Sequence, residues 1–63
     1  MTKLAEKRHE CGLSQSQLAE RSGVNRSMIQ FYEQGVNDIN KAQVRTVKKI
    51  ALALGCAIED IID

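Results

Sequence analysis

Apolar residues recur along the chain at the three- and four-residue spacing of amphipathic helices, and no stretch alternates strictly as a strand does. The breaks between these stretches contain the residues that begin and end helices. The predicted helices are residues 3–11, 15–22 and 26–34, a fourth capped by Asn40 that reaches Leu54, and a short fifth that begins at Ile58. The pattern therefore predicts an all-α protein, a compact bundle of five short helices.

Capping residues fix the limits of the second and third helices. Ser14 and Gln17 have the spacing of a capping box, in which the hydroxyl and the amide side chain each accept from a backbone N–H group. Asn25 is of a residue type that caps helix N-termini through its short polar side chain. Gly23 and Gly35 are of the type that ends helices in a left-handed conformation.

The second and third helices are joined by a turn of only three to four residues around Gly23. Ala19 is small where two steeply crossing helices would meet, and Val24 and Ile29 would fill the corner between them. An ordinary helical hairpin is the alternative, but hairpins in bundles prefer longer, nearly antiparallel helices. We therefore interpret residues 15–34 as a helix-turn-helix.

Length and charge narrow the class of protein further. The 63 residues accommodate one domain, 1–63, with a small core. All nine Lys and Arg residues lie within residues 1–49 together with five acids, a local charge of +4, whereas the acids Glu59, Asp60 and Asp63 follow without a base. This asymmetry favours a basic working face, although a solvated charged surface would give the same counts.

Cysteine, histidine and hydropathy patterns argue against several other classes. Cys11 and Cys56 form no CxxC pair, so both are expected to be buried apolar side chains, and His9 beside Cys11 would complete no metal site. No apolar run approaches the ~20 residues of a membrane span, and no signal peptide is evident, so a cytoplasmic protein without a membrane partner is expected. Without a paired nucleophile and base or a phosphate loop, no enzyme and no cofactor are expected.

The stretch CGLSQSQLAERSGVNRSMIQFYEQG, followed by VKKIALALGCAIEDII, resembles the lambda repressor and Cro-like, or Xre-type, helix-turn-helix domains. The resemblance covers nearly the whole chain and includes the family's spacing at Gln15, Ala19, Gly23 and Ile29. It implies the lambda repressor-like fold, in which the third of five short helices enters the major groove of double-stranded DNA. The implied function is that of a small sequence-specific transcriptional regulator, expected to be a repressor, with no small-molecule ligand.

The resemblance also assigns candidate DNA contacts residue by residue. The expected base contacts are Asn25, Arg26, Ser27, Gln30 and Phe31, and the expected phosphate contacts are Gln15, Gln34 and Lys41. Arginine can donate to guanine, glutamine suits adenine, and an aromatic ring can pack against a thymine methyl group. Ser27 and Gln30 would be equally ordinary in any solvated helix, and packing in the core or in a dimer is the alternative for Phe31.

Two further expectations concern contacts within and between protein molecules. The family's internal ion pair falls on Arg8 and Glu33, which we expect to be partly buried and to fix the third helix. Because one short helix reads few base pairs, we expect a homodimer on DNA. Its candidate contact is the fifth helix with Ile58, Ile61 and Ile62, unless these residues complete the core.

The alternative function is an antitoxin, or another protein-interaction module, whose DNA binding is autoregulatory. Such a protein would have a protein partner in addition to DNA. Members of the family that the chain resembles include proteins of this kind. The sequence leaves the choice between these two functions open.

Overall fold

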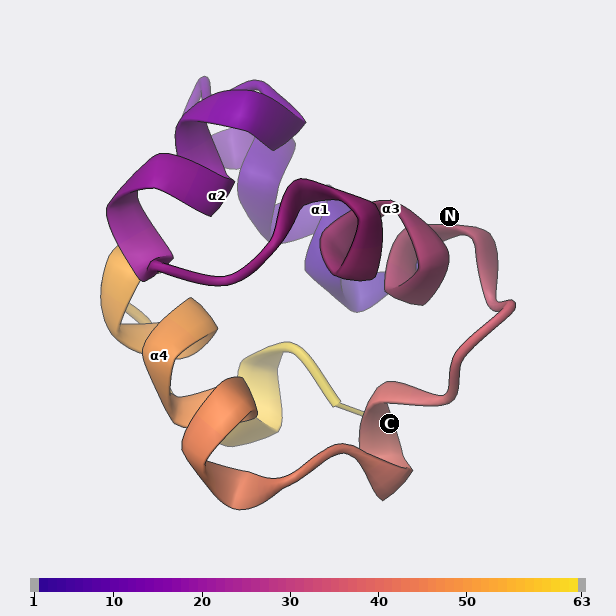
Figure 1. The fold of residues 1–63 in the computed structure, drawn as a ribbon. Helices are drawn as coiled ribbons and strands as arrows, with labels where there is room; N and C mark the ends of the chain where they lie inside the picture. The colour runs from indigo at the N-terminus through magenta and orange to yellow at the C-terminus, as the bar shows by residue number, and fades with distance from the viewer. Residues whose placement is uncertain (1, 63) are drawn as a thin grey trace.

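Four α-helices and two 3₁₀ turns surround one apolar core (Figure 1) in the computed structural model, which describes residues 2–62. The helices are α1 (Lys3–Glu10), α2 (Gln15–Ser22), α3 (Arg26–Gln34) and α4 (Val44–Leu54), and the 3₁₀ turns are η1 (Ile39–Lys41) and η2 (Ile58–Asp60). No strand occurs in this part of the chain. The all-α class predicted from the sequence is therefore confirmed.

The caps of α2 and α3 have the geometry that the sequence predicted. The Gln17 amide donates to the Ser14 hydroxyl at 3.0 Å, and the Ser14 amide donates to Gln17 Oε1 at 2.8 Å, which completes the capping box. The Ser27 amide donates to Asn25 Oδ1 at 2.7 Å at the start of α3. Gly23 ends α2 with a φ of 73°, a left-handed conformation that glycine adopts without steric cost.

The last two predicted helices differ from the structure. The fourth helix begins at Val44 with Gln43 as its N-cap, and Asn40 does not cap it. Asp38 Oδ1 instead accepts from the Asn40 amide at 2.9 Å, so this segment forms the short turn η1 and buries Ile39. A local bond from an aspartate side chain competes in this way with helix formation. The predicted fifth helix begins at Ile58 as expected but is a single 3₁₀ turn, η2, so the count of five helices is not exactly confirmed.

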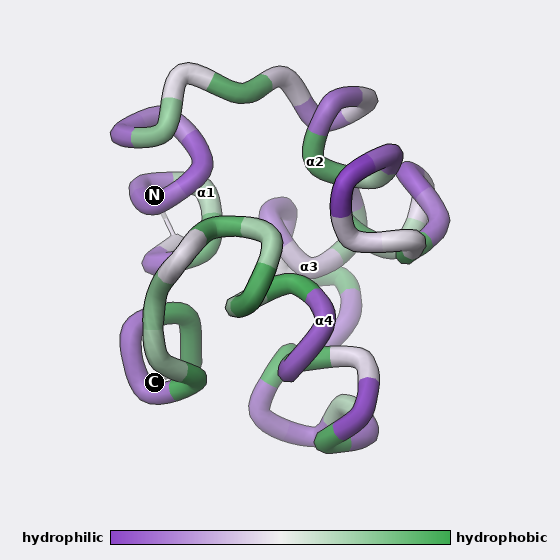
Figure 2. The backbone as a smooth tube through the Cα atoms, turned by 90° about the vertical axis from the view of Figure 1, so that its left-hand side faces the viewer, coloured by the Kyte–Doolittle hydropathy of each residue, from purple (hydrophilic) through white to green (hydrophobic). Residues whose placement is uncertain are grey.

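The core is aliphatic apart from one tyrosine. Its buried members are Leu4, Leu13, Leu18, Val24, Ile29, Tyr32, Ile39, Val47, Ile50, Ala51, Leu54 and Ile61. Figure 2 shows hydrophobic stretches of α4 toward the middle of the molecule and hydrophilic positions on the outer turns. α2 packs against both α3 and α4, while α1 packs against α3 and η2. α3 therefore packs directly against α1 and α2, and α2 connects it to α4.

Neither cysteine is a buried core residue, so that expectation was wrong. Cys11 is exposed at the end of α1, with its Sγ 3.5 Å from the Leu54 carbonyl oxygen, and Cys56 is half-buried after α4. Cys11 directly follows the last residue of α1, whereas Cys56 follows the cap Gly55 of α4 and packs, partly buried, against the core. Burial raises the pKa of the Cys56 thiol.

Residues 2–62 also bear on the other predicted classes of protein. None of the helices in this range is both long and apolar enough to span a bilayer. No cluster of three or more His, Cys, Asp or Glu side chains in the same range is placed to hold a metal ion. Asp63, the last of the predicted acidic residues, lies outside the described residues.

Candidate nucleic-acid interface

α3 has a buried face and a solvent-facing face. Ile29 and Tyr32 fix the helix in the core. The solvent-facing side holds the predicted base contacts Arg26, Ser27, Gln30 and Phe31, together with Gln34, all exposed except Gln30, which is half-buried. At 100° per residue these five positions cover less than half of the helix circumference, an arc whose centre lies nearly opposite the buried Tyr32. The structure therefore brings the predicted α3 contacts together on one surface.

Phe31 lies on the solvent-facing side of α3. Its side chain is 40% exposed, so packing in the core of this molecule does not explain it. Met28, one helical turn before Phe31, is also exposed and was not identified from the sequence, since an apolar residue in a helix is usually assigned to the core. Two large apolar side chains at the edge of a polar helix face indicate a surface that another molecule contacts.

Arg26 is exposed at the first position of α3, and no acid of residues 2–62 forms an ion pair with it. A cation at a helix N-terminus is electrostatically unfavourable because the helix dipole is positive there. Asn25 precedes it, exposed, with its Oδ1 accepting from the Ser27 amide. The start of α3 is therefore a surface of positive potential with an unused guanidinium group.

Arg8 and Glu33 form an ion pair inside the domain. Arg8 Nε lies 2.7 Å from Glu33 Oε2, and Arg8 Nη2 donates to Glu33 Oε1 at 2.9 Å, which is the two-pronged geometry of strong arginine–carboxylate pairs. Arg8 Nη1 also donates to the Leu13 carbonyl at 2.8 Å. The two side chains are only 11% and 7% exposed. The pair therefore ties α1 and the following loop to the last turn of α3.

The environment of Glu33 determines its charge. Burial would by itself raise the pKa of this carboxyl group, but the hydrogen bonds from Arg8 and then Gln15 outweigh burial and hold the pKa below its ordinary value. The hydrogen bond to Glu33 likewise raises the pKa of Arg8. Both groups are therefore charged at neutral pH.

Gln15 lies in the first turn of α2, half-buried, and its Nε2 donates to Glu33 Oε1 at 3.2 Å. This link between Gln15 and the Arg8–Glu33 pair could not be predicted from the sequence, because residues so far apart in the chain give no periodic signal. An amide nitrogen has two hydrogens, and one of them is used here. The second is available to a ligand at the start of α2.

The other predicted phosphate contacts lie on different elements. Gln34 is exposed at the end of α3, and Lys41 is exposed at the end of η1. Lys41 stands two residues before Gln43, the N-cap of α4, which makes no side-chain capping bond. The Thr46 amide donates to the Gln43 carbonyl oxygen at 3.0 Å, so within residues 2–62 only the amides of Val44 and Arg45, the first two of α4, are without an acceptor. Free amides at the start of a helix attract anions.

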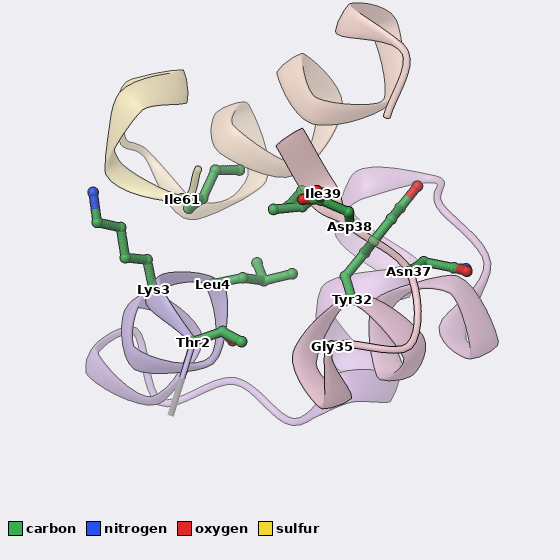
Figure 3. Close-up of a pocket in the computed structure, with 9 residues that line it drawn as sticks. All are labelled: Thr2, Lys3, Leu4, Tyr32, Gly35, Asn37, Asp38, Ile39 and Ile61. Atoms are coloured by element: carbon green, nitrogen blue, oxygen red, sulfur yellow. The ribbon is translucent and has the colours of Figure 1, made fainter. Parts of the chain in front are cut away.

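A surface hollow of about 250 Å³ lies between the start of α1, the end of α3 and η1 (Figure 3). Leu4, Ile39 and Ile61 supply its apolar wall. In the close-up the Lys3 amino group and the Tyr32 hydroxyl group both point away from the centre. These two polar groups therefore do not converge on the hollow, as a small-molecule site would require.

α2, the turn at Gly23 and α3, with α3 buried on one side and polar on the other, define a helix-turn-helix protein. The helix-turn-helix family model matches residues 4–61. The chain belongs to this family, of the lambda repressor and Xre type, whose domain is a DNA-binding regulatory domain. Comparison with curated proteins and with solved structures gave no significant match.

Proposed function

We propose that this chain is a sequence-specific transcriptional repressor in which residues 1–63 form one DNA-binding domain. α3 enters the major groove of double-stranded DNA and reads base edges. The observation that carries the proposal is the solvent-facing side of α3, where Arg26, Gln30 and Phe31 are held outward by buried Ile29 and Tyr32. Major-groove readers place the first turns of such a helix against the bases.

Each proposed base contact has a distinct chemistry. Arg26 donates two parallel hydrogen bonds to guanine O6 and N7, and Gln30 pairs with adenine N6 and N7. Phe31 packs against a thymine methyl group, which matches its exposed ring. Ser27 donates to or accepts from either base type, and Asn25 contacts base or backbone at the entrance to the groove.

Phosphate contacts position α3 without reading sequence. Gln15 donates its second amide hydrogen to a phosphate beside the start of α2, while Glu33 holds the first. Gln34 and Lys41 contact phosphates from the end of α3 and from η1. Lys41 alone of these three carries a charge, so the salt dependence of binding derives in large part from it and from Arg26.

Repression follows from occupancy of the operator. The domain has a radius of gyration of 9.9 Å, and two copies on half-sites one helical turn (~34 Å) apart cover a stretch of duplex that RNA polymerase would otherwise use. We therefore propose a homodimer on DNA, acting in the cytoplasm. This mechanism requires no ligand-sensing site.

A second candidate function is an antitoxin or related module with autoregulatory DNA binding. The observation that favours it is the exposure of large aliphatic side chains outside α3, namely Val36, Val44 and Leu52. Exposed apolar groups on a small domain are typical of protein contacts. A partner protein that copurifies in stoichiometric amount, encoded beside this chain, would identify this second function.

Selection of bound duplexes from a random DNA library tests the proposal. The folded protein should enrich one short, roughly palindromic motif whose half-sites lie one helical turn apart. A pool that stays random after selection by a protein with intact helical circular dichroism would contradict sequence-specific binding. It would leave protein contact as the role of the exposed α3 face.

A further inference from the structure

Cys11 and Cys56 stand near opposite ends of the sequence but close together in the fold. The Cys11 thiol donates to the Leu54 carbonyl oxygen at 3.5 Å, and Cys56 is the second residue after Leu54. Figure 2 shows the C-terminal end of the chain beside α1, and α1 packs against η2, the turn that follows Cys56. The end of α1 and the end of α4 therefore bring the two cysteines of the chain together.

Electrostatic interactions also place Cys56 beside α1. Burial and the Asp60 carboxylate raise the pKa of Cys56, and two groups of α1 act on the same pKa, the Lys7 ammonium by lowering it and the Cys11 thiol by raising it. Lys7 lies one helical turn before Cys11, so the two side chains share a face of the helix. Because exposed charges act on one another only over about 10 Å in salt, this face of α1 lies near the Cys56 sulfur.

The backbones of both cysteines are fixed by hydrogen bonds at helix ends. The Cys11 amide donates to the Lys7 carbonyl oxygen at 3.1 Å, and the Cys56 amide donates to the Ala51 carbonyl oxygen at 3.0 Å. Cys11 is exposed, whereas Cys56 packs, partly buried, against the core. A dissolved oxidant therefore meets the Cys11 thiol first, and the sheltered Cys56 thiol lies where it can react with the product.

We propose that Cys11 and Cys56 form an oxidation site, at which hydrogen peroxide converts the two thiols into one disulfide within the molecule. The Cys11 thiolate attacks a peroxide oxygen and breaks the O–O bond, which gives a sulfenic acid on Cys11 and a hydroxide that takes up a proton to become water. The Cys56 thiolate then attacks the Cys11 sulfur, and the sulfenic oxygen leaves as a second water. The two thiols together lose two hydrogen atoms, and one peroxide is reduced to two waters.

The disulfide would join two helix ends that the reduced protein holds together by packing and the contact between Cys11 and Leu54. In a reducing compartment such a bond is transient, because glutathione returns it to two thiols by exchange. The site is therefore suited to report a rise in peroxide. Arg8 stands on α1, so joining α1 to α4 also fastens the helix whose ion pair holds α3. The proposal does not depend on the proposed function.

The first test identifies the product of oxidation. Folded wild type at micromolar concentration is treated with one equivalent of hydrogen peroxide, free thiols are alkylated, and the protein is digested with trypsin without a reductant. Cleavage after Arg8, Arg21 and Lys49 releases Cys11 in peptide 9–21 and Cys56 in peptide 50–63. These two peptides should be recovered mainly as one linked pair from monomeric protein. Disulfide-linked dimers, or Cys11 left as a sulfinic acid, as the main product would overturn the proposal.

The second test separates the folded geometry from the mere presence of two thiols on one chain. The protein is equilibrated with mixtures of reduced and oxidised glutathione, with and without denaturing urea. The equilibrium constant for the disulfide should be at least about tenfold larger in the folded protein, because the fold holds the two thiols at high effective concentration. Equal constants in the folded and the unfolded protein would overturn the proposal.

Thermal unfolding gives an independent measure of the same coupling. If folding favours the disulfide, the disulfide must favour folding to the same extent, so the oxidised protein should have a Tm at least about 5 °C above that of the reduced protein. An oxidised protein with a lower Tm than the reduced one would show that the fold does not accommodate the bond, and this result too would overturn the proposal.

Cys11→Ser and Cys56→Ala are the controls, each with one thiol left. Cys11 is exposed, so Cys11→Ser should remain folded, as circular dichroism would show. After peroxide treatment neither variant should give the linked peptides or a raised Tm. A rise in the Tm of Cys11→Ser as large as that of wild type would assign the effect to another oxidised side chain and overturn the proposal.

Discussion

Glu33 connects the two helices of the helix-turn-helix through hydrogen bonds of a single carboxylate. It accepts from Arg8 on α1 and from Gln15 on α2, and it stands on α3. A buried carboxylate that loses its cationic partner keeps the cost of desolvation without the compensating attraction. Removing one member of the Arg8–Glu33 pair should therefore destabilise the fold more than removing one member of a surface ion pair.

Arg8→Ala should lower the free energy of unfolding by about 3 kcal/mol, the lower end of the range for breaking a buried pair. Lys49→Ala, which removes an exposed base of α4, should change it by less than about 0.5 kcal/mol. Urea unfolding followed by circular dichroism measures both. Arg8→Ala with the stability of wild type would show that the pair does not fix α3.

The lowered pKa of Glu33 also predicts how the stability of the protein changes at acidic pH. A carboxyl group whose pKa is depressed by folding stabilises the protein above its ordinary pKa of 4.5, and that contribution is lost as the pH falls through the lower folded value. The stability difference between wild type and Glu33→Gln should therefore shrink as the pH falls from about 6 to about 3. A difference that stays constant over this range would contradict the assignment.

At the scale of elements, the ends of α2 and α3 could be predicted because they depend on neighbouring residues. The capping box of Ser14 and Gln17 is one such case. The start of α4 could not be predicted in this way, since Asp38 captures the Asn40 amide and the burial of Ile39 then stabilises η1. That outcome depends on the core, which local sequence does not describe. The bond of Gln15 to Glu33 in the candidate site escaped prediction for the same reason.

The turn between α2 and α3 makes the clearest prediction for an element. Gly23 is left-handed, and a Cβ at this position would meet no atom within 4 Å, so backbone strain is the only penalty of a side chain there. Gly23→Ala should lower the free energy of unfolding by about 1–2 kcal/mol. Gly23→Asn should lose less, because asparagine tolerates this conformation. Thermal unfolding measures both, and equal losses would argue against the strain.

At the scale of the whole molecule, a net charge of +1 leaves little general attraction to DNA. Binding should therefore depend on the few cations placed at phosphates. Lys41→Gln should reduce the slope of log K against log salt by about 0.9 on the selected duplex, whereas Lys49→Gln should leave the slope unchanged. Fluorescence anisotropy at several salt concentrations measures the slopes, and equal slopes for Lys41→Gln and wild type would remove Lys41 from the interface.

The central claim is that α3 reads base edges, and Arg26 is its most specific part. The measurement is duplex selection from a random library with wild type, Arg26→Ala and the control Arg21→Ala, which removes an exposed base from the end of α2. We predict that Arg26→Ala relaxes the preference for one guanine by about 1–3 kcal/mol and leaves the rest of the motif intact, while Arg21→Ala selects the wild-type motif. An Arg26→Ala motif identical to that of wild type would contradict base readout by α3.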